Sequence, residues 1–142
     1  MKIIIGSDHR GYDLKEKIKD NFKNIEWIDV GTDSKVRTDY PIYAQLACKK
    51  IVEGIADKAV LICGSGVGIA IAANRFRKIY AALCWNEMVA RMAKEDDSCN
   101  VLVLPADFVT DQKAYEIIKA WLDAEFKEDL SYKRRLDMLD KF

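Results

Sequence analysis

The chain has 142 residues, of which 50% are hydrophobic and 32% are charged, and its 23 basic side chains balance its 23 acidic ones. This composition is typical of a globular protein, and the length predicts a single domain over residues 1–142. The balanced charge argues against a nucleic-acid or membrane partner. No apolar run is long enough to cross a bilayer and no secretory leader precedes Ile3, so we expect a cytoplasmic protein.

Apolar runs typical of strands alternate with segments of helical periodicity along the whole chain. The runs predict strands at 2–6, 25–30, 58–63, 79–84 and 101–104. The spacing of apolar residues predicts helices at 10–22, 42–53, 67–76 and 86–95, and one more after Thr110, whose hydroxyl suits an N-cap. Strands that alternate with helices need crossover connections. We therefore expect a three-layer α/β/α fold with a five-stranded, mostly parallel sheet.

Two segments lie outside this alternation. The longest expected loop is 31–40. The C-terminal stretch 131–142 is heavily charged, but Tyr132, Leu136 and Leu139 recur in it at helical spacing. This pattern predicts a helix outside the main sheet, docked either on this subunit or on a partner.

A glycine-rich turn follows the third expected strand, in the motif Cys63-Gly64-Ser65-Gly66-Val67-Gly68. Glycines let the backbone approach a ligand closely, and the helix expected from Val67 would aim its free N–H groups at the turn. The turn predicts a site for a small anion beside a potential thiolate. A dinucleotide site is disfavoured, because its glycine motif belongs after the first strand.

Two further polar groups are expected near this turn. Asp8 and His9 follow the first strand, and the segment 96–100 precedes the fifth. Ligands of open parallel sheets bind outside the carboxyl ends of the strands, so we expect all three groups at that edge. His9 is either a surface or capping residue or a contact for phosphate or hydroxyl groups.

The four cysteines are widely spaced and form no CxxC pair, which favours reduced thiols over disulfides or metal knuckles. The single histidine, His9, disfavours a histidine-based metal site. Cys63 is either a small buried hydrophobe at a strand end or a base or nucleophile. Core packing is the expected role of the other three, which lack the glycine turn: Cys48, Cys84 and Cys99.

These motifs together resemble the type B ribose-5-phosphate isomerase family, which includes galactose-6-phosphate and allose-6-phosphate isomerases. The resemblance extends over nearly the whole chain and is carried by Ile4–Gly11, Arg37–Pro41, Ile62–Ile69 with Ala72–Asn74, Asn100–Leu102 and Ala120–Leu122. It implies a strand order of 2-1-3-5-4, no metal or organic cofactor, and a homodimer or a dimer of dimers. It also implies active sites shared between subunits, with the tail from about residue 127 to 142 packing on the partner.

The resemblance implies that an aldose phosphate and a ketose phosphate are interconverted through a cis-enediolate. Cys63 matches the base that moves the proton, and Asp8 would bind sugar hydroxyls. His9 and Arg135 match phosphate-contacting positions, although Arg135 alone would read as part of a solvated charged face. Asp97 is expected among the substrate-binding residues. The developing oxygen would be held by the Ser65 hydroxyl and the turn's N–H groups, at Gly64, Gly66, Val67 and Gly68.

The sequence departs from the family pattern at three kinds of position. Asp96 stands where a ring-opening histidine is usual, Asp107 where an arginine is usual, and Ser131 and Tyr132 where the tail usually has arginine and histidine. Either Asp96 takes over as the ring-opening acid or base, or the substrate needs no ring opening, as for a tetrose phosphate.

Ribose 5-phosphate and ribulose 5-phosphate are the expected substrate pair. A tetrose or hexose phosphate and a non-catalytic sugar-phosphate-binding role are the alternatives. A cysteine hydrolase is disfavoured, because no His/Asp pair is placed to activate the thiol.

Overall fold

Five parallel strands form one sheet in the order β2-β1-β3-β5-β4. The computed structural model describes residues 1–142. The strands are β1 (Lys2–Ser7), β2 (Glu26–Asp29), β3 (Ala59–Cys63), β4 (Ala81–Leu83) and β5 (Val101–Pro105). A short 3-10 helix, η1 (His9–Gly11), precedes α1 (Tyr12–Asn21), and the other helices are α2 (Tyr40–Val52), α3 (Val67–Ala73), α4 (Glu87–Asp97), α5 (Asp111–Asp123) and α6 (Leu130–Leu139). The α/β fold and its strand order confirm the prediction.

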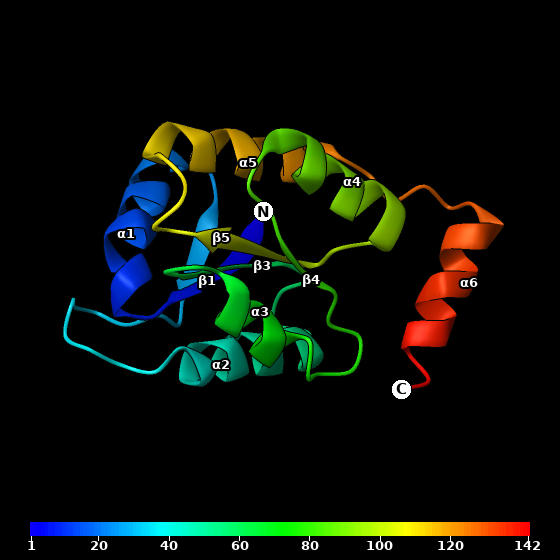
Figure 1. The fold of residues 1–142 in the computed structure, drawn as a ribbon, viewed down its shortest axis with the longest axis horizontal. Helices are drawn as coiled ribbons and strands as arrows, with labels where there is room; N and C mark the ends of the chain where they lie inside the picture. Colours follow the sequence, from blue (N-terminus) through cyan, green and yellow to red (C-terminus); the bar gives the residue numbers. More distant parts are fainter.

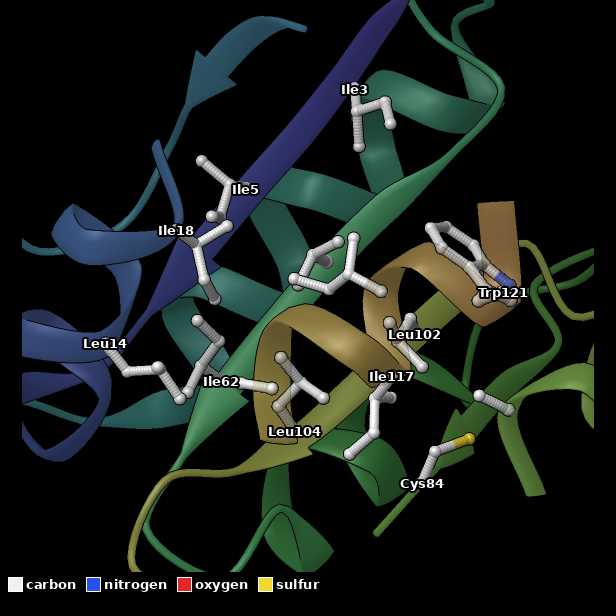
Figure 2. Close-up of a cluster of buried hydrophobic side chains, with 14 of the residues drawn as sticks. Ile3, Ile5, Leu14, Ile18, Ile62, Cys84, Leu102, Leu104, Ile117 and Trp121 are labelled. Carbon is white, nitrogen blue, oxygen red and sulfur yellow. The ribbon is translucent and has the colours of Figure 1, made fainter. Parts of the chain in front are cut away.

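Helices cover both faces of the sheet, with α1, α4 and α5 on one side and α2 and α3 on the other (Figure 1). Successive residues of the buried strands point to opposite faces, so each strand feeds two separate cores. In β1, Ile3 and Ile5 join the core under α1, α4 and α5 (Figure 2), whereas Ile4 joins the core under α2 and α3. Continuous apolar strands are what a sheet covered on both faces requires.

The sixth helix, α6, lies apart from both layers, at the right of Figure 1. None of its residues is buried, and Leu130 and Met138 are 82% and 58% exposed. The expected tail helix is therefore present and stands outside the sheet. No helix in the structure combines the length and the apolar character that a membrane span needs.

Helix α3 is shorter than the 67–76 segment that its periodicity predicts. It ends at Ala73 because Asn74, its C-cap, turns its side chain to the edge strand. The Asn74 amide nitrogen donates to the Ala81 carbonyl at 2.9 Å, and its oxygen accepts from the Ala81 N–H at 2.8 Å. These two tertiary bonds pin the short strand β4 to the end of α3, and a local pattern does not encode them.

An ion-pair network around the buried Lys15 side chain joins α1 to the end of β2. The Lys15 side chain is 2% exposed, and its Nζ lies 2.5 Å from Asp29 Oδ2 and 2.8 Å from Glu16 Oε1. Burial alone would raise the pKa of Asp29, but hydrogen bonds from Lys15, Lys19 and the Gly31 N–H outweigh it and hold that pKa below its ordinary value. In the folded protein Asp29 therefore binds its proton less tightly than in the unfolded chain.

The lowered pKa of Asp29 predicts that the folded protein loses stability at acid pH. The stabilisation from Asp29 is complete above its unfolded pKa of about 4 and is lost as the pH falls through the lower folded pKa. We expect Asp29→Asn to cost about 1–3 kcal/mol at pH 7, because Lys15 stays buried with one partner fewer, and to flatten the decline in stability below pH 4. Denaturant unfolding between pH 3 and 7 measures both effects. Asp13→Asn, which breaks the exposed pair with Lys35 and leaves the Lys15 network intact, is the control and should cost little.

Candidate active site

The strand order reverses direction between β1 and β3, and the crevice at their carboxyl ends is where an open α/β sheet binds ligands. Two of the predicted groups meet there. Asp8 and His9 follow β1, and Cys63 ends β3. The Asp8 N–H donates to the Ile62 carbonyl at 3.4 Å, which ties the two strand tips together.

The glycine turn after β3 presents unused hydrogen-bond donors. The N–H groups of Gly64, Ser65, Gly66 and Gly68 donate to no acceptor in the protein. Gly66 adopts a φ of +76°, a conformation in which a side chain would be strained, and a Cβ there would clash with Leu83. Because α3 has only seven residues, its dipole is small, and these individual N–H groups are the main attraction for an anion.

One predicted donor of the turn is already occupied. The Val67 N–H donates to the Ser65 Oγ at 3.2 Å, so it is not free for a ligand, contrary to the expectation for Val67. The bond fixes the Ser65 side chain while leaving its own hydroxyl proton available. Ser65 is exposed, so that proton can reach a bound substrate.

Cys63 differs from the other three cysteines in its surroundings. Burial raises the pKa of Cys48 and Cys84 to about 12 and that of Cys99 to about 11, and each of these thiols contacts a backbone carbonyl. They are structural, as predicted. The Cys63 thiol has no hydrogen-bond partner, and its residue is 4% exposed where the core under α2 and α3 meets the turn. Of the four, only Cys63 leads into the glycine turn, whose N–H groups are free.

Asp8 and His9 line a cavity of about 420 Å³ with Arg10 and the segment Arg37–Tyr40. Asp8 is 5% exposed, and its Oδ1 accepts from the N–H groups of Arg10 at 3.0 Å and Gly11 at 3.2 Å. The Asp8 carboxylate is therefore held rigidly by η1 at the cavity wall.

The loop 31–40 orients His9. His9 Nδ1 lies 3.2 Å from both the N–H and the carbonyl of Thr38. The Thr38 N–H donates to Nδ1 in the neutral tautomer that carries its proton on Nε2, and Nδ1 donates to the Thr38 carbonyl when Nδ1 is itself protonated. In the first tautomer and in the charged ring, Nε2 is a hydrogen-bond donor, which suits an anionic ligand.

Tyr40 connects this cavity to the glycine turn, a role that its sequence position did not reveal. A Cβ on Gly68 would lie 2.6 Å from Tyr40 Cζ and 2.8 Å from Cε1, so the ring packs directly on the glycine. The proline that follows Tyr40 indicates only that a helix, α2, starts there, and it does not indicate that Tyr40 contacts the glycine turn. Tyr40 therefore borders both the cavity and the glycine turn.

The third predicted group does not join this site within one chain. Asp96 and Asp97 end α4 and precede β5, so they lie at the amino edge of the sheet, where Val101 pairs with Ala59. Cys63 pairs with Pro105 at the other end of β5, about 13 Å away along the strand. The prediction that Asp96 and Asp97 share the carboxyl edge was wrong, since a segment that precedes a parallel strand lies at its amino end.

The two aspartates have different partners. Lys127 Nζ lies 3.3 Å from the Asp96 Oδ1 and 2.9 Å from Glu95. Burial, followed by the nearby Asp96 charge, raises the pKa of Asp97 above its ordinary value, and Arg135 opposes the shift. Asp97 lines a second cavity of about 660 Å³ between the amino edge and the tail.

Arg135 belongs to α6, with its guanidinium 5.6 Å from the centre of the Tyr132 ring. Together with Asp97 it marks the amino edge of the sheet as a second cluster of predicted site residues, apart from Cys63. No group of three His, Cys, Asp or Glu side chains is arranged to hold a metal ion.

The fold and the carboxyl edge of the sheet define a class of protein. It is a Rossmann-like α/β domain with a cysteine and a donor-rich glycine turn at the carboxyl ends of its central strands. The sequence profile of the family described as Ribose/Galactose Isomerase matches residues 3–139. Ribose-5-phosphate isomerase B of Escherichia coli is 40% identical over 128 residues, which cover 89% of this chain and 86% of that protein. The chain belongs to the ribose/galactose isomerase family.

Solved structures agree with this assignment. A ribose 5-phosphate isomerase from Thermotoga maritima superposes with a TM-score of 0.97 at 40% identity, covering 99% of this chain and 98% of that one. Ribose-5-phosphate isomerase B from Mycoplasma genitalium, determined with bound ribulose-5-phosphate, gives a TM-score of 0.93 at 35% identity, covering 99% and 94%.

Proposed function

We propose that this protein interconverts ribose 5-phosphate and ribulose 5-phosphate, with Cys63 as the base that moves the proton. The observation that carries the proposal is the direct passage from Cys63 into a turn with four free N–H groups. The bound ribulose-5-phosphate in the Mycoplasma genitalium relative supports the choice of substrate.

The reaction divides the work between the thiol and the turn. Cys63, as thiolate, takes the proton from carbon 2 of the open-chain aldose, and the electron pair moves onto the carbonyl oxygen to give a cis-enediolate. The thiol then returns the proton to carbon 1, while a proton passes from the hydroxyl on carbon 2 to the oxygen on carbon 1. The N–H groups of Gly64, Ser65 and Gly66 face negative charge only while it develops, which is how such donors lower a barrier.

Asp8 and His9 orient the rest of the sugar. Asp8 accepts hydrogen bonds from sugar hydroxyls with its rigidly held carboxylate, and His9 donates its Nε2 proton to the phosphate. This division follows from chemistry, because a carboxylate repels phosphate whereas a donor attracts it.

The working unit is a homodimer in which each site draws on both subunits. Asp97 and Arg135 lie too far from Cys63 of their own chain to reach its substrate. A second copy that sets its amino edge against the carboxyl edge of the first would bring them there. Helix α6 supports this arrangement, because none of its residues is buried in one chain and Leu130, Met138 and Leu139 are exposed.

A sugar phosphate that needs no ring opening is the second candidate substrate. Asp96 stands where the family usually has a ring-opening histidine, and its carboxylate is engaged by Lys127. A tetrose phosphate is too short to cyclise through its phosphorylated oxygen and would bypass this step.

A panel of tetrose, pentose and hexose phosphates incubated in heavy water tests the function. We expect deuterium at the exchanging carbon and ketose formation with ribose 5-phosphate, both followed by NMR. Turnover of the tetrose phosphate alone would favour the second candidate. Binding without exchange across the panel would instead make the protein a sugar-phosphate-binding member of its family.

A further inference from the structure

The guanidinium of Arg10 lies directly on the backbone of Gly64, the residue that follows Cys63. A Cβ built on Gly64 would fall 2.5 Å from both Cζ and Nε of Arg10 and 2.8 Å from its Nη1. The glycine is therefore needed for this contact, independently of any role of its N–H group. Arg10 reaches across from η1 and covers the start of the glycine turn.

Asp107 holds Arg10 in this position. The Arg10 Nη2 is hydrogen-bonded and ion-paired to Asp107 Oδ2, and the Asp107 N–H donates to the Gly64 carbonyl at 3.0 Å. The pair thus spans the tips of β1, β3 and β5. Nη2 is the only side-chain nitrogen of Arg10 with a protein acceptor, so the Nε and Nη1 donors are unused.

The unused donors belong to a side chain that borders both the glycine turn and the cavity. The Arg10 side chain is 57% exposed and lines the 420 Å³ cavity beside His9. A guanidinium carries its charge at every working pH and offers paired donors that match a phosphate. Lys or His would not supply this fork.

On the basis of the proposed function, we infer that Arg10 binds the phosphate group of the substrate, with Asp107 as its positioning residue. His9 and Arg10 then hold the phosphate from two sides of the cavity, while the reacting carbons lie at Cys63. Since Asp107 competes for the guanidinium, it also sets how tightly Arg10 can bind the anion.

Titration calorimetry with inorganic phosphate, ribose 5-phosphate and unphosphorylated ribose tests this inference. We expect Arg10→Ala to weaken binding of both phosphate-containing ligands by about 10- to 100-fold, and to leave ribose binding unchanged. Arg10→Lys should recover part of the loss. In turnover, the Arg10→Ala change should raise KM much more than it lowers kcat. The control is Arg91→Ala, which removes an equally exposed arginine paired with Glu95 on α4 and should change nothing.

The variant Asp107→Asn is an independent test. It keeps an acceptor oxygen for Arg10 and removes the negative charge that competes with phosphate for the guanidinium. Phosphate should bind several-fold more tightly to this variant, and the gain should vanish when Arg10→Ala is added. Unchanged phosphate binding in Arg10→Ala, or an equal Asp107→Asn effect with and without Arg10, would overturn the inference. Because calorimetry needs no turnover, a failed isomerase assay with a positive binding result would count against the proposed function alone.

Discussion

Cys63→Ala should lose about 10²- to 10⁴-fold in isomerisation rate, which is the range that a positioned general base contributes. Deuterium exchange at the reacting carbon should fall by the same factor, because exchange and isomerisation share the proton-removal step. Substrate affinity should change little, since the turn and the cavity remain. Exchange is followed by NMR in heavy water and affinity by calorimetry.

Two variants separate chemistry from packing in this prediction. Cys63→Ser keeps the shape of the side chain but replaces the thiol with a much weaker acid, so it should be nearly as inactive. Cys48→Ala removes an equally buried thiol from the same core and should keep full activity after a loss of about 1 kcal/mol in stability. Wild-type exchange in Cys63→Ala would assign the proton transfer to another group.

The carboxyl-edge part of the site could be predicted from sequence because each of its motifs directly follows a strand. Asp8 and His9 follow β1 and Cys63 ends β3, and parallel strands bring such ends to one edge. The strand order itself came from the family resemblance, which supplied long-range pairing that periodicity does not contain. Local patterning therefore predicted the helices and strands, and the family resemblance predicted which strands are adjacent in the sheet.

The contacts that complete the site could not be predicted, because they join segments far apart in the chain. Tyr40 packs on Gly68 and Arg10 on Gly64 only because the tertiary fold brings loop and turn together. A glycine in the sequence can indicate that another group packs closely on its backbone, but it does not identify that group. The buried Lys15 was missed for a similar reason, since its ion-pair partner Asp29 lies on another element.

The misplacement of Asp96 and Asp97 has a different origin. Their position before β5 was known, and the direction of a parallel strand already assigns that segment to the amino edge. The resemblance placed them in an active site, which holds only if that site includes residues of a second chain. If the implied site is real, a second chain must supply Asp96 and Asp97 to it, which is the arrangement proposed above.

A mixing experiment tests the proposal that each site is shared between two subunits. Cys63→Ala and Arg135→Ala should each be nearly inactive as homodimers, because every site then lacks one component. In a mixed dimer, however, one of the two sites receives Cys63 from one subunit and Arg135 from the other, and both are intact. Random re-association of equal amounts gives half mixed dimers with one working site each, so roughly one quarter of wild-type activity should return.

The recovered fraction distinguishes the arrangements sharply. Sites built within single chains would give no recovery, because each chain carries one defect wherever it is paired. Re-association after mild denaturation is needed for exchange, and mixed dimers can be counted by native mass spectrometry with one variant isotope-labelled. Recovery should rise in proportion to their number. As a control, Cys63→Ala mixed with a second Cys63→Ala preparation should recover nothing, since no pairing can restore the missing thiol.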